Sequence, residues 1–271
     1  MAIASVADLL ASMPRSSTFI RSGANFDAGG SSNSMWLRGT YPAGASAPSP
    51  GINGANCSRT TAGALVYENP ASGNSYFSGF DIFSTDNACI LLCDRLWHNS
   101  SISATTTTEQ AISMSALPAR DRNGADDGED VMAWLEVSGA TGAGGSVTNT
   151  TLRYTNSAGT DTRTATLTHT GVGGLAVGYS ASFALQAGDK GIQSIQGLTL
   201  GTTYSSGTMH LVLARVIALI PVWHHAGGSS LQSAIRQAMP RVYDDSCLYF
   251  IQFANSSGLY DLNGTLRFAQ G

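Results

Sequence analysis

Charged residues are scarce in this chain, where they make up 12% of 271 residues, about half the usual share. Lysine is nearly absent, with Lys190 as the single copy, and the arginines lie scattered along the sequence. Nucleic-acid binding through counterion release needs clustered cations, and the sequence contains no such cluster. We therefore expect no nucleic-acid partner, in line with a formal net charge of −4.

Long apolar runs are also missing. The longest one, at residues 216–223, is far too short to cross a bilayer as a helix. The first residues lack the basic segment of a secretory signal peptide, and Asp8 interrupts their apolar stretch. We therefore expect no membrane partner and a chain that is made, and folds, in a cytoplasm.

Sequence motifs of the common enzyme classes are absent. Residues 178–182 approach a Gly-x-Ser-x-Gly nucleophile motif but lack the second glycine, and Lys190 follows no phosphate-binding glycine loop. Glycosidases need two suitably placed carboxylates. The four glutamates show no spacing that pairs them: Glu68, Glu109, Glu129 and Glu136. The sequence predicts a non-enzymatic protein with no catalytic residues and no cofactor.

Cysteine is limited to four residues, at positions 57, 89, 93 and 247. Cys89 and Cys93 lie four apart in an apolar run, so in a strand they point to the same face. No second closely spaced pair and no histidine cluster accompanies them, which makes a zinc site a poor interpretation. We expect buried thiols, with one disulfide as the alternative.

Two polar clusters raise the question of a metal. His224 and His225 are adjacent, so in a strand they point to opposite faces and do not readily share an ion. Residues 121–130 are rich in carboxylates and glycine, but the EF-hand frame fails at Ala125 and at Asp126, where glycine is required. We expect no metal site. For His224 and His225 the favoured interpretation is a polar end to the preceding strand, with a metal or catalytic role as the alternative. For residues 121–130 it is an acidic turn, with calcium binding as the alternative.

Short strand patterns fill the middle of the chain. Residues 76–83, 131–137, 177–185 and 209–217 are rich in alternating or continuous apolar residues, and residues 64–67 form a shorter strand pattern. The clearest hairpin joins 150–155 to 162–167 through the turn residues 156–160. Many strands without interleaved helices indicate an all-β fold: a sandwich, a jelly roll or a barrel. Among these we predict an antiparallel β-sandwich or jelly roll, over a core domain at 64–225.

The N-terminal region, residues 1–63, has a different composition. Residues 5–13 predict a short helix that ends at Pro14, and the following stretch is rich in Gly, Ser, Ala and Pro. We interpret this stretch as an extended arm, which in an assembly lies across a neighbouring subunit. The predicted assembly anchors in the arm are Trp36, Leu37, Arg38 and Tyr41.

The C-terminal region, residues 226–271, predicts a small helix and a hairpin. Residues 229–239 carry apolar side chains at helical spacing between a serine cap and Pro240. Residues 259–262 and 265–268 flank Asn263-Gly264, the strongest short hairpin signal. Residues 247–253 predict one more strand.

Aromatic rings offer a further alternative, because they stack on sugar faces. Trp36, Trp97, Trp134 and Trp223, together with nine tyrosines, are the candidates for a sugar site. Trp134 falls inside a strand pattern, so packing in the core is the favoured interpretation.

Several short segments between residues 94 and 223 resemble uncharacterised virion structural proteins of tailed bacteriophages, of the capsid-decoration or head-surface type. They are DRLWHNS at 94–100, LPARDRNG at 117–124, TNSAGT at 155–160, LQAGDKGIQSI at 185–195, and LAR at 213–215 with IPV at 220–222. The resemblance implies a location in the virion, the major capsid protein or other virion proteins as partners, and a homo-oligomer, with a trimer favoured.

The function expected from this resemblance is that of a capsid decoration or cement protein, which binds the major capsid protein and stabilises the shell. A surface of hydroxyls and amides suits contacts with neighbouring subunits, because desolvating a hydroxyl costs less than desolvating an ion. Two alternatives stay open: a head or tail adhesin that binds host surface glycan, and a depolymerase.

Overall fold

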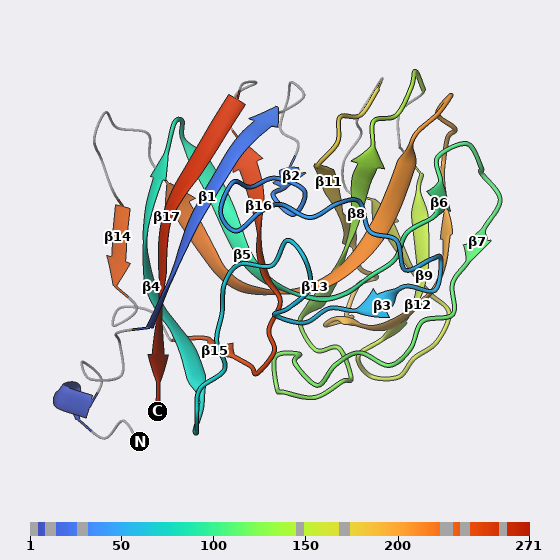
Figure 1. Cartoon of the computed structure of the whole chain (residues 1–271). Helices are drawn as coiled ribbons and strands as arrows, with labels where there is room; N and C mark the ends of the chain where they lie inside the picture. The colour runs from blue at the N-terminus through green and yellow to red at the C-terminus, as the bar shows by residue number, and fades with distance from the viewer. Residues whose placement is uncertain are drawn as a thin grey trace.

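A computed structural model describes residues 5–8, 15–25, 32–144, 149–167, 174–222, 230–233, 239–254 and 259–271. In this part of the chain the fold is all-β and antiparallel, with two sheets (Figure 1). Helix is limited to one turn at residues 6–8 within the described residues, and the rest of the predicted helix at 5–13 lies outside them. The described part of the chain contains no helix with the length and apolar character that a bilayer crossing requires.

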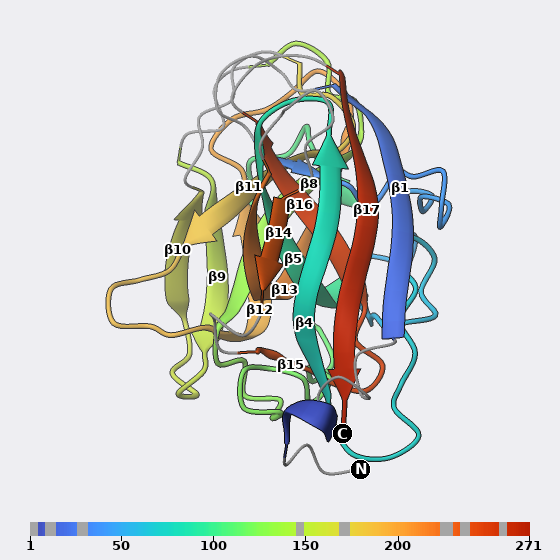
Figure 2. The ribbon, with the colours of Figure 1, turned by 90° about the vertical axis from the view of Figure 1, so that its left-hand side faces the viewer.

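The smaller sheet is a curled layer of five strands, seen face-on in Figure 2. Its order is β1-β17-β4-β14, and β15 also pairs with β4. The strands are β1 (Arg15–Asn25), β17 (Leu259–Gln270), β4 (Ser75–Ser84), β14 (Ser230–Ser233) and β15 (Arg241–Val242).

The larger sheet closes on itself into a six-stranded barrel. The ring runs β2-β16-β5-β13-β8-β11 and returns from β11 to β2, because Tyr179 and Ser180 pair with Asn33 and Ser32. The six strands are β2 (Ser32–Ser34), β16 (Leu248–Ala254), β5 (Ala88–His98), β13 (Thr208–Val222), β8 (Val131–Gly139) and β11 (Tyr179–Ala184).

Beyond β11 the same sheet continues outside the barrel as β10-β9-β12-β7. Two short strands complete it, with β3 paired to β5 and β6 paired to β13. These strands are β10 (Arg163–Leu167), β9 (Thr151–Asn156), β12 (Ile192–Thr199), β7 (Gln110–Ala111), β3 (Ala55–Asn56) and β6 (Ile102–Ser103).

Three apolar clusters follow from the alternation of side chains along the barrel strands. One fills the barrel interior and includes Trp36, Cys93, Trp134 and Tyr249. The intervening residues of the same strands face outward. They pack against the β9-β10-β12 extension on one side and against the smaller sheet on the other. The barrel therefore lies between two outer layers, as Figure 1 shows.

The predicted all-β antiparallel class is confirmed, and so is the hairpin of residues 150–167, where Arg163 pairs with Tyr154. The predicted sandwich or jelly roll is replaced at the centre by a closed barrel. The three-residue strand β2 decides this, because it pairs with both β16 and β11 and so closes the ring between them. The predicted strand at 64–67 is irregular backbone, although Leu65 is fully buried.

The N-terminal segment does not form a free arm in the described residues. Strand β1 pairs along its length with β17, and β2 completes the barrel. The predicted segments 1–63, 64–225 and 226–271 each contribute strands to both sheets. The predicted boundaries therefore do not coincide with the division into sheets. The composition of this segment indicated a loop, but hydrogen bonds to strands far along the sequence make parts of it strands.

The C-terminal predictions are corrected at two places. Residues 230–233, placed in the predicted helix, form strand β14 on β4, while 234–238 lie outside the described residues. The predicted Asn263-Gly264 hairpin is also wrong, because both residues lie in the middle of the continuous strand β17. A Cβ at Gly264 would come within 2.1 Å of the carbonyl oxygen of Asp81, so this glycine permits a close strand approach rather than a turn.

Candidate functional site

Three ionisable side chains meet inside the barrel. Arg95 Nη1 donates to Glu136 Oε2 at 2.9 Å, and His210 Nε2 lies 2.8 Å from the same oxygen. The three residues come from the adjacent strands β5, β8 and β13, and their side chains are at most 1% exposed. Burial on this scale is tolerated only when the charges are paired.

Aromatic rings complete the surroundings of Arg95. Its guanidinium carbon lies 4.4 Å from the ring centroid of Trp36 and 5.1 Å from that of Tyr249. Arg95 Nε also donates to His98 Nδ1 at 3.1 Å. The arginine is therefore held by one carboxylate, one imidazole and two ring faces, which fixes the packing of the barrel interior.

Electrostatics in this cluster favour one charge state. Burial raises the pKa of Glu136, but Arg95 and the hydrogen bond with His210 outweigh it and lower that pKa to about 2. Burial lowers the pKa of His210 in spite of the neighbouring carboxylate. At neutral pH the interior thus holds an ionised Arg95–Glu136 pair and a neutral His210 that donates from Nε2.

A second buried ion pair lies close by, on the outer side of β5. Arg120 Nε donates to Asp94 Oδ2 at 3.2 Å, and Ser246 Oγ donates to the same oxygen at 2.7 Å. The backbone N–H of Cys247 donates to Asp94 Oδ1 at 2.8 Å. Asp94 therefore joins the loop around residue 120 to the start of β16.

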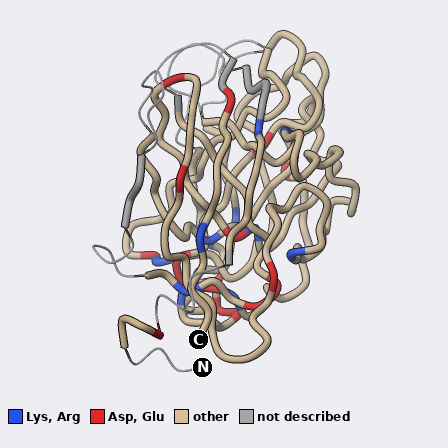
Figure 3. Tube along the Cα trace, turned by 60° about the vertical axis from the view of Figure 1, so that its left-hand side comes forward, with Lys and Arg blue, Asp and Glu red and all other residues tan. Residues whose placement is uncertain are grey.

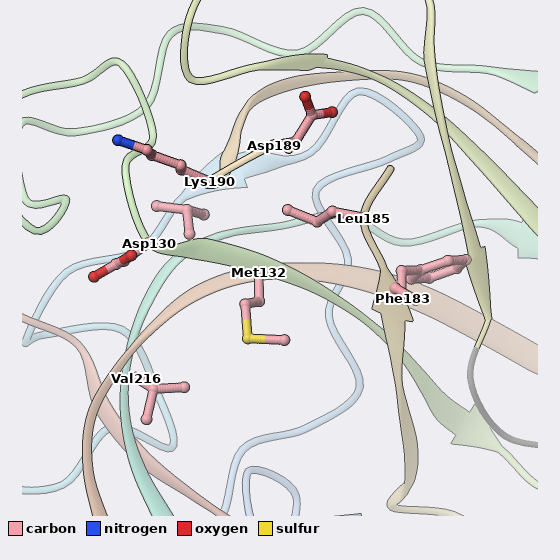
Figure 4. A pocket seen from close by; sticks show the side chains of 9 residues that line it. Asp130, Met132, Phe183, Leu185, Asp189, Lys190 and Val216 are labelled. Carbon is pink, nitrogen blue, oxygen red and sulfur yellow. The ribbon is translucent and has the colours of Figure 1, made fainter. Parts of the chain in front are cut away.

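An open cavity of about 380 Å³ lies where β8, β11 and β13 approach the 189–190 turn (Figure 4). Met132, Leu185 and Phe183 contribute apolar lining, with Asp130 and Asp189 as the carboxylates. Each carboxylate already has a cationic partner, since Asp130 pairs with Arg122 at 3.1 Å and Asp189 with Arg163 at 2.9 Å. Both carboxylates that line the cavity are therefore already ion-paired, which does not favour a general acid–base pair in this cavity.

The acidic segment at 121–130 is organised by its own backbone. Asp121 Oδ1 accepts from the N–H groups of Asn123 and Ala125, both at 2.8 Å, and Asp121 Oδ2 accepts from Glu129 at 3.1 Å. These bonds give the carboxylate the role of a turn organiser. Among the described residues no group of three His, Cys, Asp or Glu side chains could hold a metal ion, and His224 and His225 lie outside them.

The tryptophans considered for a sugar site are internal where the structure describes them. Trp36, Trp97 and Trp134 are each at most 2% exposed. Their rings belong to the apolar clusters, in agreement with the packing interpretation. Trp223 lies outside the described residues.

The four predicted assembly anchors lie at different depths. Trp36 is 1% exposed and packs inside its own barrel, so its ring is not available to a neighbour. Leu37 and Arg38 are half-buried, and Arg38 donates to the carbonyl of Val177 at 3.1 Å. Tyr41 is 51% exposed and keeps the accessibility that an anchor needs.

Tyr41 belongs to an exposed row on the smaller sheet. The backbone N–H of Ile20 in β1 donates to the carbonyl of Tyr41 at 2.6 Å. Ile20 pairs across to Asn263 in β17, which pairs in turn with Phe83 in β4. Ile20 and Phe83 are 40% and 41% exposed. We call Tyr41, Ile20 and Phe83 the apolar row; the half-buried Asn263 lies between Ile20 and Phe83.

The rest of this face is polar but weakly charged. Ser16 and Thr18 of β1 are exposed on it, and the charged pair Arg267–Asp81 neutralises itself. Figure 2 shows the three strands β1, β17 and β4 side by side, and Figure 3 shows how sparse charged residues are along the chain. This face therefore combines exposed rings and aliphatic groups with hydroxyls, which desolvate at little cost.

Sequence reasoning did not single out Arg95, Glu136 and His210. A signal was present, because Glu136 and His210 each interrupt an otherwise apolar strand pattern. The meeting of these residues depends on the sheet order. Glu136 of β8 pairs with His210 of β13, and Arg95 lies on β5, on the other side of β13.

Comparison with known proteins adds little. No family model matches the chain, and no curated protein does. Among solved structures, the infectious bursal disease virus VP2 subviral particle is 9% identical with a TM-score of 0.21, covering 95% of this chain and 80% of that one. A structure of the Gx strain of the same virus is 10% identical with a TM-score of 0.19, covering 94% and 79%. Likeness this weak carries no argument about function.

Proposed function

We propose that this chain is a non-enzymatic structural protein of a tailed-phage virion, specifically a decoration or cement protein that binds the major capsid protein. The resemblance of residues 94–223 to virion structural proteins supports this proposal. The low charge of the chain supports it as well, because uncharged surfaces lose little on burial against a neighbour.

The observation that carries the proposal is the apolar row on the outer face of the smaller sheet. Its three large side chains, Tyr41, Ile20 and Phe83, are exposed by 40–51% although they come from three separate segments of the chain. Exposed apolar groups gathered on one face favour protein contact. By contrast, the ionisable groups inside the barrel are sealed from solvent, which favours a scaffold over a reaction centre.

In this proposal many copies act together. Each copy buries the face that contains the apolar row against the shell, and the contacts hold neighbouring capsid subunits together. A homotrimer links individually weak contacts and so increases the avidity of the whole. The chain is made in the host cytoplasm and is located in the virion.

The test is co-sedimentation of the purified chain with capsids that lack it, followed by electron microscopy of the decorated particles. We expect saturable binding and density for the chain on the capsid surface. The double variant Ile20→Ser/Phe83→Ser should weaken binding at least tenfold, since it removes two exposed apolar contacts. Leu219→Ser is the matched control, because Leu219 is 58% exposed but lies on β13.

Equal loss of binding in the double variant and in the control would contradict the role of the apolar row. Absence of the chain from purified native particles would contradict the virion location. Saturable binding to host-envelope polysaccharide without capsid binding would favour an adhesin instead, and new reducing ends on that polysaccharide would reveal a depolymerase.

A further inference from the structure

Two of the four cysteines meet at one edge of β5. The backbone N–H of Cys57 donates to the carbonyl of Leu96 at 2.9 Å, and the N–H of Arg95 donates to the carbonyl of Cys247 at 2.8 Å. The two cysteines therefore bind consecutive residues of the same strand. Both side chains belong to the apolar cluster of the barrel interior, and each thiol shifts the pKa of the other.

Their backbone positions are held from several sides. The carbonyl of Cys57 accepts from Arg120 Nη2 at 2.8 Å, and the N–H of Cys247 donates to Asp94 Oδ1 at 2.8 Å. Arg120 and Asp94 themselves form the buried ion pair described above. One network thus keeps both cysteines in place although 190 residues separate them in the sequence, from position 57 to position 247.

The surroundings activate Cys57 in particular. Because Arg95 Nε–H can only donate, His98 accepts through Nδ1, and the ring of neutral His98 carries its proton on Nε2. The hydrogen bond from Cys247 lowers the pKa of Cys57 well below its usual value, and His98 adds to this effect while burial opposes it. Burial instead raises the pKa of Cys89 and of Cys93.

Cys57 also lies where the chain can open locally. It follows β3, a strand of two residues that are both exposed. Opening this edge breaks the pairing of β3 with β5 and the two backbone hydrogen bonds of Cys57, to Leu96 and Arg120. Such a local opening costs far less than global unfolding. Cys93, in the middle of β5, has no comparable route to solvent.

We propose that Cys57 and Cys247 form a redox-convertible pair, free as thiols here and closing to a disulfide when a small-molecule disulfide reaches the opened edge and is attacked there by Cys57. The Cys57 thiolate attacks one sulfur of the oxidant and releases one thiol, which gives a mixed disulfide. Cys247 loses its proton and displaces the second thiol from Cys57. The net reaction oxidises two protein thiols and reduces one disulfide to two thiols.

The disulfide would join the segment that follows β3 to the start of β16, along one edge of β5. A covalent link between positions so distant in sequence restricts the unfolded chain strongly and raises stability. This inference does not depend on the proposed function, since it concerns only the chemistry of the folded chain.

The test is to incubate the reduced, folded protein with oxidised glutathione, to quench the exchange with acid, and then to block free thiols in denaturant with N-ethylmaleimide, which still alkylates thiols at mildly acidic pH. Peptide mapping without reduction should show Cys57 linked to Cys247, with Cys93 alkylated. The link should disappear after dithiothreitol, and the oxidised protein should melt at a higher temperature than the reduced one.

Cys89→Ser is the matched control, because Cys89 is the most exposed of the four thiols yet has no partner role in the proposal. This variant should form the link as the original chain does, whereas Cys247→Ser should stop at a glutathione adduct on Cys57. Recovery of Cys57 and Cys247 as separately alkylated residues after oxidation would overturn the proposal. So would faster modification of Cys89 than of Cys57, because exposure alone would then set reactivity.

Discussion

Arg95 and Glu136 form an ion pair of 2.9 Å between two strands that are not neighbours. Strand β13 lies between β5 and β8, and its residue His210 contacts the same carboxylate oxygen at 2.8 Å. The three side chains therefore tie three consecutive strands of the barrel together from the inside. Because the cluster is sealed, its contribution is to stability and to the packing arrangement of the barrel.

Replacing Glu136 by Gln should destabilise the protein strongly. The substitution keeps the shape but leaves the Arg95 guanidinium buried without an anion, which typically costs about 3–5 kcal/mol. Urea denaturation followed by tryptophan fluorescence measures the change. The control is Asp130→Asn, which removes the exposed pair with Arg122 and should cost less than about 1 kcal/mol. Similar losses in the two variants would show that burial of the pair has no energetic consequence.

Stability should fall as the solution becomes acidic, in two stages. Burial lowers the pKa of His210 below its ordinary value of 6.5, so the folded state loses stability as pH falls below 6.5. The pKa of Glu136 falls to about 2 from its ordinary 4.5, so a further loss accompanies acidification from pH 4.5 toward 2.

Thermal unfolding between pH 8 and pH 4 measures the first stage. In His210→Gln the amide can still donate to Glu136 but does not titrate, so the slope between pH 6.5 and 4.5 should become shallower. An unchanged slope would assign the acid sensitivity to other groups.

Gly264→Ala should destabilise the smaller sheet, although alanine is ordinarily a mild replacement. The added methyl group would collide with the backbone carbonyl of Asp81, and backbone of a central strand cannot move aside cheaply. We expect a loss of about 1–3 kcal/mol by chemical denaturation. Thr265→Ala, at the adjacent half-buried position, is the control and should cost clearly less. Full tolerance of Gly264→Ala would indicate that β17 and β4 do not approach as described.

Arg21→Lys should loosen the segment at residues 38–63. Arg21 is buried and its two Nη atoms donate to the carbonyls of Arg38, Pro42 and Gly63 at 2.7–3.1 Å. One ammonium group cannot reach all three, and each carbonyl left unpaired costs about 1–3 kcal/mol.

Limited proteolysis should therefore cut the Arg21→Lys variant faster within residues 38–63 than elsewhere. Arg59→Lys serves as the control, because Arg59 pairs with Asp245 at a partly exposed position. A proteolysis pattern identical to that of the original chain would remove Arg21 as the organiser of this segment.

Local sequence pattern predicted the strands with a regular apolar pattern of their own and the hairpin that closes over a short turn. The run at residues 131–137 became β8, and the turn at 156–160 joined β9 to β10 as expected. In both cases the alternation of side chains and the turn residues act over a few positions. The same pattern predicted that Trp134 packs internally, which its 2% exposure confirms.

The same reasoning failed where the local pattern indicated another structure and pairing with distant strands overrode it. Asn263-Gly264 has the composition of a tight turn, but β1 and β4 flank it and hold it extended. Residues 230–233 belong to the stretch 229–239, whose apolar residues have helical spacing, yet pairing with β4 makes them a strand. Trp36 lies in a stretch with the composition of a loop, yet the closed ring of strands buries it completely.

The sequence by itself determined the all-β class, most strand positions and the scarcity of charge, because these follow from composition and from alternation between neighbouring residues. Only the tertiary structure decided the barrel closure by β2, the meeting of Arg95, Glu136 and His210, and the pairing of Cys57 with Cys247. Each of these depends on which distant strands hydrogen-bond to one another, and sheet order is set by the burial of the whole chain at once.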